Sequence, residues 1–369
     1  MRSSPQRPPD ARNILDKLTW GPPIGTLSPG GFMKILVTGG AGFIGSHTVV
    51  ELHNSGFDSI ILDNFSNSEK KALAGIEQII GKSVKYYEAD INDSTIWDKI
   101  FTDQKIDGII HFAAAKAVGE SVEKPLKYYR NNVSATVLML EKMLEHQVSN
   151  LVFSSSCTVY GEPDSLPVTE NSAVKLATSP YGNTKQICES IIKDTVQSTN
   201  ALQAISLRYF NPIGAHDSCL IGELPLGPPA NLVPFLTQSV AGIRGQLLVY
   251  GNDYPTSDGT AVRDYIHVVD LAKAHVSAFN LLLKQPEGQY YDFFNIGTGK
   301  GSSVLEVITA FEEATNLKVD YAIKPRREGD VIAVYADCTK SKAILGWQTE
   351  KTLKDALGDA WNWQKKITL

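Results

Sequence analysis

Tyr181 and Lys185 are spaced so that they could act together on one proton. They stand four residues apart in the segment 179–185 (SPYGNTK), which places them on one face of a helix that Pro180 is well suited to start. A free tyrosine, with a pKa of about 10, is a poor base at neutral pH. A neighbouring ammonium, a helix N-terminus and an oxidised nicotinamide each favour the phenolate. We therefore expect the pKa of Tyr181 to be lowered towards that of a general base.

Ser156 lies in the serine-rich run 153–161 (FSSSCTVYG), which leaves the end of a predicted strand. Open parallel sheets bind ligands at this edge, and a serine hydroxyl there could share the proton of a bound substrate. A Tyr-x-x-x-Lys pair by itself is more often an ordinary helix surface. Combined with this serine and with the loop described next, it predicts Tyr181, Lys185 and Ser156 as catalytic residues.

The segment 38–47 (TGGAGFIGSH) joins a predicted strand to a helix and carries glycines at Gly39, Gly42 and Gly45. Such glycines permit a tight turn, a close approach of backbone N–H groups to a pyrophosphate, and close packing of the helix on the sheet. Asp63 ends the next predicted strand, where a carboxylate accepts hydrogen bonds from an adenosine ribose and favours NAD over NADP. The alternative for the glycines is that they serve only a tight turn, and the alternative for Asp63 is a solvated turn residue. The order of strand, glycine loop, helix and strand favours a dinucleotide site.

These residues need a scaffold of alternating strands and helices, and the sequence predicts one. The predicted strands are Lys34–Thr38, Ser59–Leu62, Val84–Glu88, Ile106–Phe112, Leu151–Ser154 and Ile205–Tyr209. The predicted helices are Gly42–Ser55, Ser94–Phe101, Val122–His146 and Tyr181–Thr199, the third burying a face formed by Val137, Leu140 and Leu144. This order predicts the α/β class: a Rossmann-type, doubly wound parallel sheet covered on both faces.

The chain divides into three parts by composition. Residues 1–32 hold six of the 18 prolines and form an N-terminal extension that we expect to be disordered, with a mitochondrial targeting role as the minor alternative. Residues 33–210 form the predicted NAD-binding domain, to which a segment near 260–283 returns. Prolines punctuate the chain after Phe210, so 211–369 is predicted to be a smaller, mixed α/β lobe that binds the substrate.

Composition excludes several classes of protein. The 369 residues are 43% apolar and 20% charged, with a net charge of −5 and no basic stripe, which argues against a nucleic-acid partner. The four cysteines form no metal-binding pattern, so we expect free thiols in the cytoplasm and no metal site. No apolar run approaches the length of a membrane span.

Taken together, the motifs resemble the extended short-chain dehydrogenase/reductase family and, within it, the enzymes that epimerise UDP-sugars at C4. The resemblance runs from Lys34 nearly to the C-terminus and rests on 38–47, 62–68 (LDNFSNS), 111–121 (HFAAAKAVGES), 153–161, 179–185, 208–216 (RYFNPIGAH), 251–272 (GNDYPTSDGTAVRDYIHVVDLA) and 325–330 (PRREGD). It implies an isomerase of galactose metabolism that interconverts UDP-glucose and UDP-galactose. The C4 hydrogen is removed, the 4-keto sugar rotates, and the hydride returns to the opposite face.

Carried over position by position, the resemblance implies two sets of binding residues. The NAD set contains the three glycines, Tyr181 and Lys185. Its other members are Phe43, Ile44, Asp63, Asn64, Ser66, Asn67, Asp90, Ile91, Phe112, Ala113, Ala114, Lys116, Asn131 and Phe210. The UDP-sugar set is Ser156, Asn211, Asn231, Leu232, Tyr250, Arg263, Arg327, Asp330 and Val334. The two arginines suit a diphosphate, because a guanidinium binds phosphate oxygens bidentately; the alternative for each is a salt bridge at the surface.

Two positions refine the expected activity. Relatives that dehydrate sugar nucleotides carry an Asp-Glu pair after the threonine of the serine strand, whereas here Thr158 is followed by Val159 and Tyr160. A tyrosine at the position of Val334 restricts the family's sugar pocket, so the smaller valine predicts added activity on UDP-N-acetylglucosamine and UDP-N-acetylgalactosamine.

The alternatives to this function are a UDP-glucuronate or UDP-pentose 4-epimerase and a non-catalytic NAD-binding regulator. The resemblance also implies a homodimer formed by the helices at 122–146 and 181–199.

Overall fold

The computed structural model describes residues 32–327 and 331–368 of the chain. The predicted N-terminal extension therefore lies almost entirely outside the described residues, and so does Asp330, one of the residues predicted to bind the substrate.

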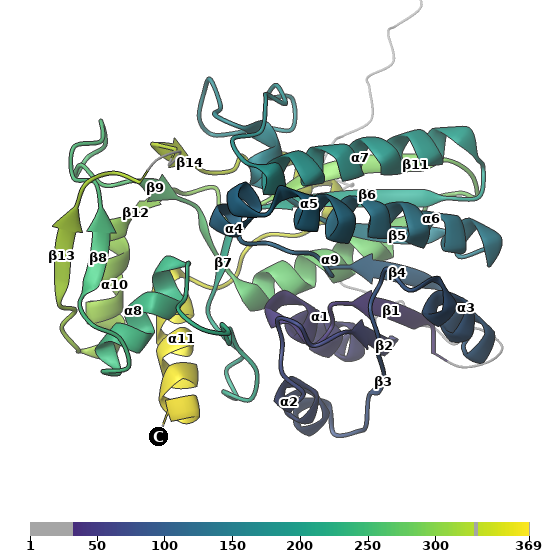
Figure 1. Cartoon of the computed structure of the whole chain (residues 1–369), viewed down its shortest axis with the longest axis horizontal. Helices are drawn as coiled ribbons and strands as arrows, with labels where there is room; N and C mark the ends of the chain where they lie inside the picture. Colours follow the sequence, from purple (N-terminus) through teal and green to yellow (C-terminus); the bar gives the residue numbers. More distant parts are fainter. Residues whose placement is uncertain (1–31, 328–330, 369) are drawn as a thin grey trace, which may run out of the picture.

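A seven-stranded parallel sheet forms the centre of the larger lobe (Figure 1), with the strand order β11-β6-β5-β4-β1-β2-β3. Its strands are β1 (Lys34–Thr38), β2 (Asp58–Asp63), β3 (Lys85–Glu88), β4 (Gly108–His111), β5 (Asn150–Ser156), β6 (Gln203–Tyr209) and β11 (Tyr290–Ile296). Short apolar runs rich in Ile and Val form its inner strands, as expected for a sheet that is covered on both faces. The order reverses between β1 and β4, which confirms the predicted doubly wound architecture.

Helices cover both faces of this sheet. The helices of the larger lobe are α1 (Phe43–Asn54), α2 (Lys71–Ile80), α3 (Ser94–Asp103), α4 (Val118–Glu123), α5 (Pro125–Tyr128), α6 (Ala135–Glu145), α7 (Pro180–Ser198) and α9 (Val268–Leu282). Side chains alternate along the strands: in β1, Ile35 and Val37 pack with α1, α2 and α9, whereas Leu36 packs with α3, α6 and α7. Of the elements of this lobe, α2, α9 and β11 have no counterpart among the predicted helices and strands, although α9 falls within the segment near 260–283 that is predicted to return to this domain.

The single helix predicted over Val122–His146 is wrong, because the chain breaks before Pro125. Lys124 leaves the helical conformation (φ −131°, ψ 56°), as the residue before a proline tends to do. After α5, a π-helical segment over Tyr129–Ser134 leads into α6. The wider π-turn shifts which side chains face the sheet. Leu140 is buried and Leu144 packs on the core, as predicted, whereas Val137 is 38% exposed and Met139 and Met143 are buried instead.

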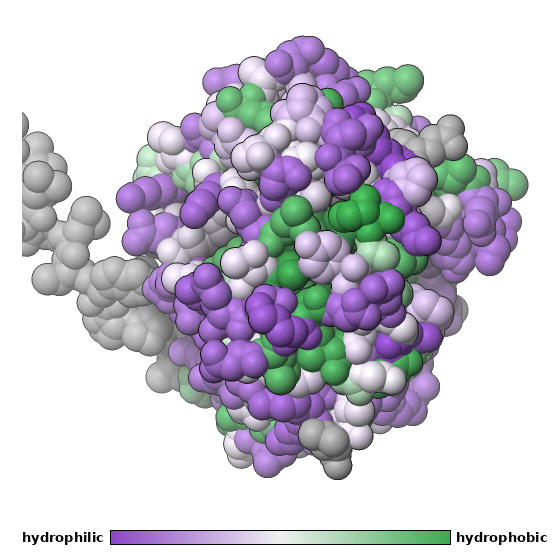
Figure 2. All heavy atoms as spheres, turned by 90° about the vertical axis from the view of Figure 1, so that its left-hand side faces the viewer, coloured by the Kyte–Doolittle hydropathy of each residue, from purple (hydrophilic) through white to green (hydrophobic). Residues whose placement is uncertain are grey.

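The smaller lobe has its own apolar core between α8 (Leu232–Val240), α10 (Val304–Thr315) and α11 (Leu353–Thr368). Its short strands are β7 (Asn211–Ile213), β8 (Leu247–Tyr250), β9 (Val262–Arg263), β10 (Tyr265–His267), β12 (Ser302–Ser303), β13 (Tyr321–Lys324) and β14 (Ala333–Val334). Figure 2 shows the end of the molecule formed by this lobe, where apolar side chains gather among hydrophilic ones. The exposed apolar side chains of β13 are Tyr321 and Ile323.

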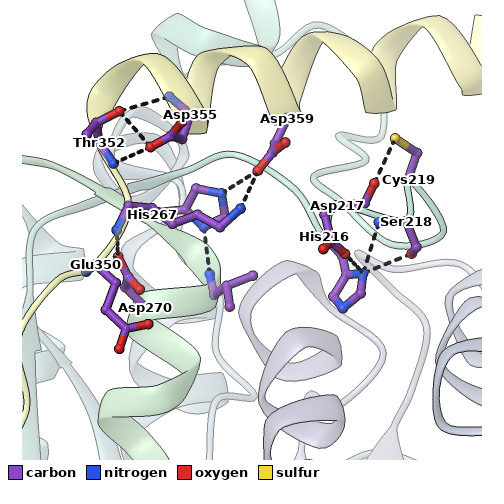
Figure 3. Close-up of polar contacts among 12 residues, drawn as sticks. His216, Asp217, Ser218, Cys219, His267, Asp270, Glu350, Thr352, Asp355 and Asp359 are labelled. Atoms are coloured by element: carbon purple, nitrogen blue, oxygen red, sulfur yellow. Dashed lines mark hydrogen bonds and ion pairs between the residues drawn. The ribbon is translucent and has the colours of Figure 1, made fainter.

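His267 links the two lobes (Figure 3). Its Nδ1 accepts a hydrogen bond from the backbone N–H of Val269 in the first turn of α9. Its Nε2 therefore carries the proton and donates to Asp359 of α11 over 3.1 Å. Lys351 also pairs with Asp359, at 2.8 Å, so α11 is tied to the start of α9. Among the described residues, no helix is both long enough and apolar enough to span a membrane.

Candidate functional site

The glycine loop between β1 and α1 packs too closely for side chains. A Cβ at Gly45 would lie 2.2 Å from the carbonyl oxygen of Gly39, and one at Gly39 would lie 2.9 Å from the amide nitrogen of Ala113. Gly39 also has a positive φ of 68°, which favours glycine. Gly42 caps α1 without a side-chain hydrogen bond, and the first turn of α1 carries no acidic residue. This bare helix N-terminus fits the pyrophosphate of a dinucleotide.

Asp63 lies at the end of β2, beside this loop, and is 7% exposed. Its Oδ2 accepts a hydrogen bond from the Ala41 N–H at 3.0 Å, and its Oδ1 accepts from the Phe65 N–H and the Ser68 hydroxyl, each at 2.9 Å. The carboxylate is thus fixed in place, and its oxygens retain lone pairs for a ribose hydroxyl.

The other residues predicted at the adenosine end lie at the neighbouring strand ends. Asn64 donates to Asp90 at 2.9 Å and accepts from the backbone of Ser66; these three residues and Asn67 are exposed. Ile91 is buried, and its carbonyl accepts from the Trp97 indole. The structure therefore brings Asn64 and Asp90 together at the carboxyl edge of the sheet.

The predicted continuation of the cofactor path follows β4. The Ala113 N–H points to the Thr38 hydroxyl at 3.4 Å, and the same hydroxyl lies 2.7 Å from Nδ1 of His111. Burial lowers the pKa of His111 to about 3, so this imidazole is neutral and structural at physiological pH. Phe112 packs against His275, with ring centroids 4.6 Å apart. Ala114 is half-buried next to these residues, and Phe210 is buried at the end of β6.

Tyr181 and Ser156 meet at the junction of α7 and β5. The Ser156 hydroxyl hydrogen-bonds to the Tyr181 phenol, and it also accepts from the Thr158 N–H at 3.2 Å. Burial raises the pKa of Tyr181 to about 12, and the hydrogen bond from Ser156 opposes this shift. The expected lowering of this pKa is therefore not present in the protein alone, because burial outweighs the polar contacts.

Lys185 lies one turn further along α7 and is 3% exposed. Its ammonium donates to the carbonyl oxygen of Ser154 at 2.5 Å and lies 4.8 Å from the centre of the Phe153 ring. Burial lowers its pKa to about 8. Its amine is held at the strand end, on the same helix face as the phenol.

The residues predicted to bind the sugar nucleotide come from several distant segments of the smaller lobe. The Arg327 guanidinium stacks over the Tyr250 ring at 3.9 Å, and both the arginine and Asn231 are exposed. Leu232 begins α8 and packs on the core of this lobe, and Asn211 begins β7 with its N–H bonded to the carbonyl of Asp264.

Arg263 and Val334 are direct partners in the parallel pair of β9 and β14. Val334 is 6% exposed and packs in a cluster that includes Phe210 and Cys157, the residue after Ser156. The position at which the resemblance implies control of substrate size therefore lies next to the end of β5, which Ser156 forms. The adjoining Asp264 accepts hydrogen bonds from Thr298, Gly299 and Ala336, which fixes β9 beneath the site.

Glu223 is a polar residue of this region that the sequence reasoning missed. Its carboxylate accepts from Asn231 at 3.0 Å and lies 3.7 Å from the Lys116 ammonium. Its backbone carbonyl accepts from the indole of Trp363 at 2.8 Å. Lys116 belongs to the predicted NAD set and Asn231 to the predicted UDP-sugar set, so Glu223 connects the two. It lies in an irregular, proline-rich loop, where no periodic pattern marks it.

The predicted cofactor residues as a whole fit NAD. An uncapped helix N-terminus faces the loop of small residues, and an anchored carboxylate ends the second strand. Asn131 lies in the π-helical segment and donates to Asn132, which in turn donates to Thr184 of α7, next to Lys185. These features match a dinucleotide with a central pyrophosphate and an adenosine ribose at one end.

The chain is similar to known proteins over nearly its whole described length. The family model of GDP-mannose 4,6 dehydratase matches residues 36–359. The UDP-glucose 4-epimerase of Haemophilus influenzae is 49% identical over 333 residues, which cover 90% of this chain and 98% of that protein.

Two solved structures share the fold closely. The UDP-glucose 4-epimerase of Stenotrophomonas maltophila, solved with bound NAD and formylated UDP-arabinopyranose, has a TM-score of 0.88 at 44% identity, covering 91% of this chain and 99% of that one. The Bifidobacterium longum enzyme in complex with NAD+ and UDP has a TM-score of 0.86 at 48% identity, covering 90% and 98% of the two chains.

Proposed function

The chain belongs to the family of UDP-glucose 4-epimerases, and from this premise we propose that it interconverts UDP-glucose and UDP-galactose with NAD as its cofactor. The observation that carries the proposal is the contact between the Tyr181 phenol and the Ser156 hydroxyl at the carboxyl end of β5. This contact lies at the edge where the glycine loop and Asp63 would hold a dinucleotide. A protein that only senses NAD needs no such pair.

In the proposed reaction, Tyr181 accepts the proton of the sugar's 4-hydroxyl, and Ser156 orients that hydroxyl. Bound NAD supplies the acceptor, and later the donor, of the C4 hydride and brings a positive charge that favours the phenolate. Lys185 adds a second positive charge on the same face of α7. After the 4-keto sugar has turned over, Tyr181 returns the proton, so the product differs from the substrate only at C4.

Arg263 and Arg327 are the proposed partners of the diphosphate, which must stay bound while the sugar turns. Their guanidinium groups can each bind two phosphate oxygens. Thr158 is followed by Val159 and Tyr160, both fully buried, so the Asp-Glu pair that dehydrating relatives use is absent at this position. The reaction therefore ends in inversion rather than in loss of water.

Replacement of the phenol tests this function. We expect Y181F to lower the turnover of UDP-galactose about 10³-fold or more, because general acid–base catalysis contributes on this scale. UDP should bind the variant as it binds the wild type, since the diphosphate contacts are untouched. The assay is conversion of UDP-galactose to UDP-glucose without added cofactor, with the NAD released on denaturation as a second readout. Y321F, at the exposed β13, is the matched control; wild-type turnover in Y181F would refute the proposal.

Val334 supports a second, broader activity on the N-acetylated sugars. It packs in one cluster with Phe210 and Cys157 and pairs with Arg263, so its small side chain borders the proposed sugar site. We expect the wild type to epimerise UDP-N-acetylglucosamine, and V334Y to lose this activity while it retains that on UDP-glucose. Absence of UDP-N-acetylglucosamine turnover in the wild type, beside strong UDP-glucose turnover, would contradict the broader activity.

We also infer a cytoplasmic homodimer. The inference is supported by apolar side chains on α4–α6 that are exposed in the single chain: Val118, Val122, Leu126 and Val137, with Leu126 81% exposed. Exposed apolar faces on neighbouring helices favour association into a bundle. Light scattering after size exclusion should give a dimer for the wild type and a monomer for L126E; a monomeric wild type would contradict the inference.

The inferred cytoplasmic location is supported by the free cysteines, which are consistent with a reducing compartment.

A further inference from the structure

Glu189 of α7 and Arg208 of β6 form a buried ion pair directly below the catalytic residues. The arginine Nε donates to Oε1 of the glutamate at 2.9 Å, and Nη2 donates to Oε2 at 2.5 Å. The two residues are only 7% and 4% exposed. Burial of two charges costs several kcal/mol that even a good pair rarely recovers fully. The stability of the fold alone therefore does not account for this pair.

The glutamate completes a series of contacts between α7 and β5. Tyr181, Lys185 and Glu189 are spaced by four residues, so they lie on one face of the helix. Tyr181 meets the Ser156 hydroxyl, and Lys185 meets the Ser154 carbonyl. Glu189 accepts from the hydroxyl of Ser155, between those two, at 2.5 Å. Three successive residues of β5 are therefore matched to three successive turns of α7.

Arg208 extends the same network to the segment that follows Ser156. Its Nη1 contacts the Tyr160 hydroxyl at 3.1 Å, and its guanidinium stacks over Phe293 at 3.9 Å. Tyr160 in turn donates to Asn295 of β11 at 2.7 Å. The segment that follows Ser156 is thus also fixed by β6 and β11.

The electrostatic surroundings of Lys185 give Glu189 a second role. Of the described residues, the titratable ones that act on or adjoin this ammonium are Cys188 and Glu189 on α7, His111 on β4, and Tyr209 on β6, which hydrogen-bonds to Ser154. His111 is neutral, and burial raises the pKa of Cys188, so this thiol is neutral too. Glu189 therefore supplies the carboxylate that favours the charged form of the lysine.

We propose that Glu189, held by Arg208 and Ser155, is a positioning residue of this site: it fixes α7 along the end of β5 and keeps Lys185 an ammonium beside Tyr181. The proposal rests on the proposed epimerase function, because the effects of changing Glu189 are measured as changes in epimerase turnover. It predicts that the charge and the geometry of Glu189 affect catalysis separately.

The main test is the double variant E189Q/R208Q, which removes both charges but keeps groups able to hydrogen-bond. We expect kcat for UDP-galactose to fall about 10-fold or more while KM stays within about 2-fold, since the proposed diphosphate contacts are elsewhere. The alkaline limb of the kcat profile should move down by ~0.5–1 pH unit, because the lysine loses its proton earlier without the carboxylate. D292N, which removes the half-buried carboxylate that pairs with Lys340, is the matched control and should leave the profile in place.

The variant E189D separates the two effects. It keeps the charge but shortens the side chain, so the alkaline limb should stay near its wild-type pH while kcat falls about 5-fold or more. If thermal unfolding shows that E189Q/R208Q does not fold, the E189D variant still tests the proposal. An E189D protein with the kcat of the wild type would overturn it. An unshifted alkaline limb in a folded double variant would overturn it too. A wild type that converts no UDP-galactose would instead refute the proposed function itself.

Discussion

The two halves of the candidate site differ in how their polar groups are held. In the proposed dinucleotide half, Asp63 already accepts three hydrogen bonds and Lys185 donates to a backbone carbonyl, and both are buried. In the proposed sugar-nucleotide half, Arg327 and Asn231 are exposed and come from separate segments. The glycine loop and the anchors of Asp63 and Lys185 are thus built by backbone and close packing, whereas Arg327 and Asn231 join the second half as individual exposed side chains. Substitutions should therefore disrupt the first half as a unit and tune the second residue by residue.

The largest effect is expected at Gly45, where the dinucleotide half depends on close packing. G45A places a Cβ 2.2 Å from the Gly39 carbonyl oxygen, so α1 must move away from β1. Overpacking of this kind costs about 3 kcal/mol of stability or occasionally more. Urea unfolding should show the loss, and the NAD content of the purified protein should fall with it.

The matched control is Gly358 in α11, around which there is open space. G358A should stabilise the protein by about 0.5–1 kcal/mol, because alanine favours a helix over glycine. If G45A has the unfolding midpoint and the NAD content of the wild type, the dinucleotide half does not depend on close packing, and the proposed difference between the two halves is wrong.

A smaller and more local effect is expected at Arg327. R327A should raise KM for UDP-galactose about 10–100-fold with kcat little changed, because charge-assisted hydrogen bonds contribute about 1.5–3 kcal/mol. The neighbouring R326A is the control, since Arg326 pairs with Asp253 at 2.8 Å instead of stacking on Tyr250. An equal rise in KM in both variants would show that the effect comes from the loss of any positive charge in this region, and not from the specific contact of Arg327 with the diphosphate.

The last effect is absent at neutral pH and appears only in acid, and it should again fall on the dinucleotide half. Burial lowers the pKa of His47 and His111 to about 3 and that of His275 to about 4. The unfolded chain binds protons below a pH of about 6.5, whereas these folded imidazoles stay neutral. The free energy of unfolding should therefore fall as the pH drops from about 6.5 towards 4.

Urea unfolding at several pH values measures this slope. H275Q, which keeps a donor for the Leu271 carbonyl, should reduce the slope by about one bound proton between pH 6 and 5. H146Q is the control, because His146 lies near the surface beside Asp98. Identical slopes in all three proteins would mean that buried histidines do not set the acid limit.

Most of the sheet could be predicted from the sequence, because most of its strands are short apolar runs that alternate with helical segments. The missed strand β11 begins with Tyr290 and Tyr291, which are only half-buried at the sheet edge, so it lacks the continuous apolar pattern. The predicted helix over 122–146 is broken because Pro125 moves Lys124 out of the helical conformation, and the apolar periodicity around it does not show this break. The rotation introduced by the π-helical segment leaves no periodic signal at all.

The site could be predicted only in part for a similar reason. Tyr181 and Ser156 are found from local motifs, and their contact follows from the fold. Glu223 and Glu189 act through partners distant in sequence, Lys116 and Arg208, so spacing along the chain does not reveal them. The raised pKa of Tyr181 depends on how deeply the phenol packs, which a motif does not record.

The position of β11 also constrains how the protein is made. β6 ends at Tyr209 and β11 begins at Tyr290, yet the two strands are neighbours in the sheet. While the ribosome synthesises the intervening segments, β6 presents an unpaired edge, which is prone to join strands of other chains. Slow translation between these strands therefore prolongs the aggregation-prone interval, and rapid synthesis or a chaperone that covers β6 shortens it.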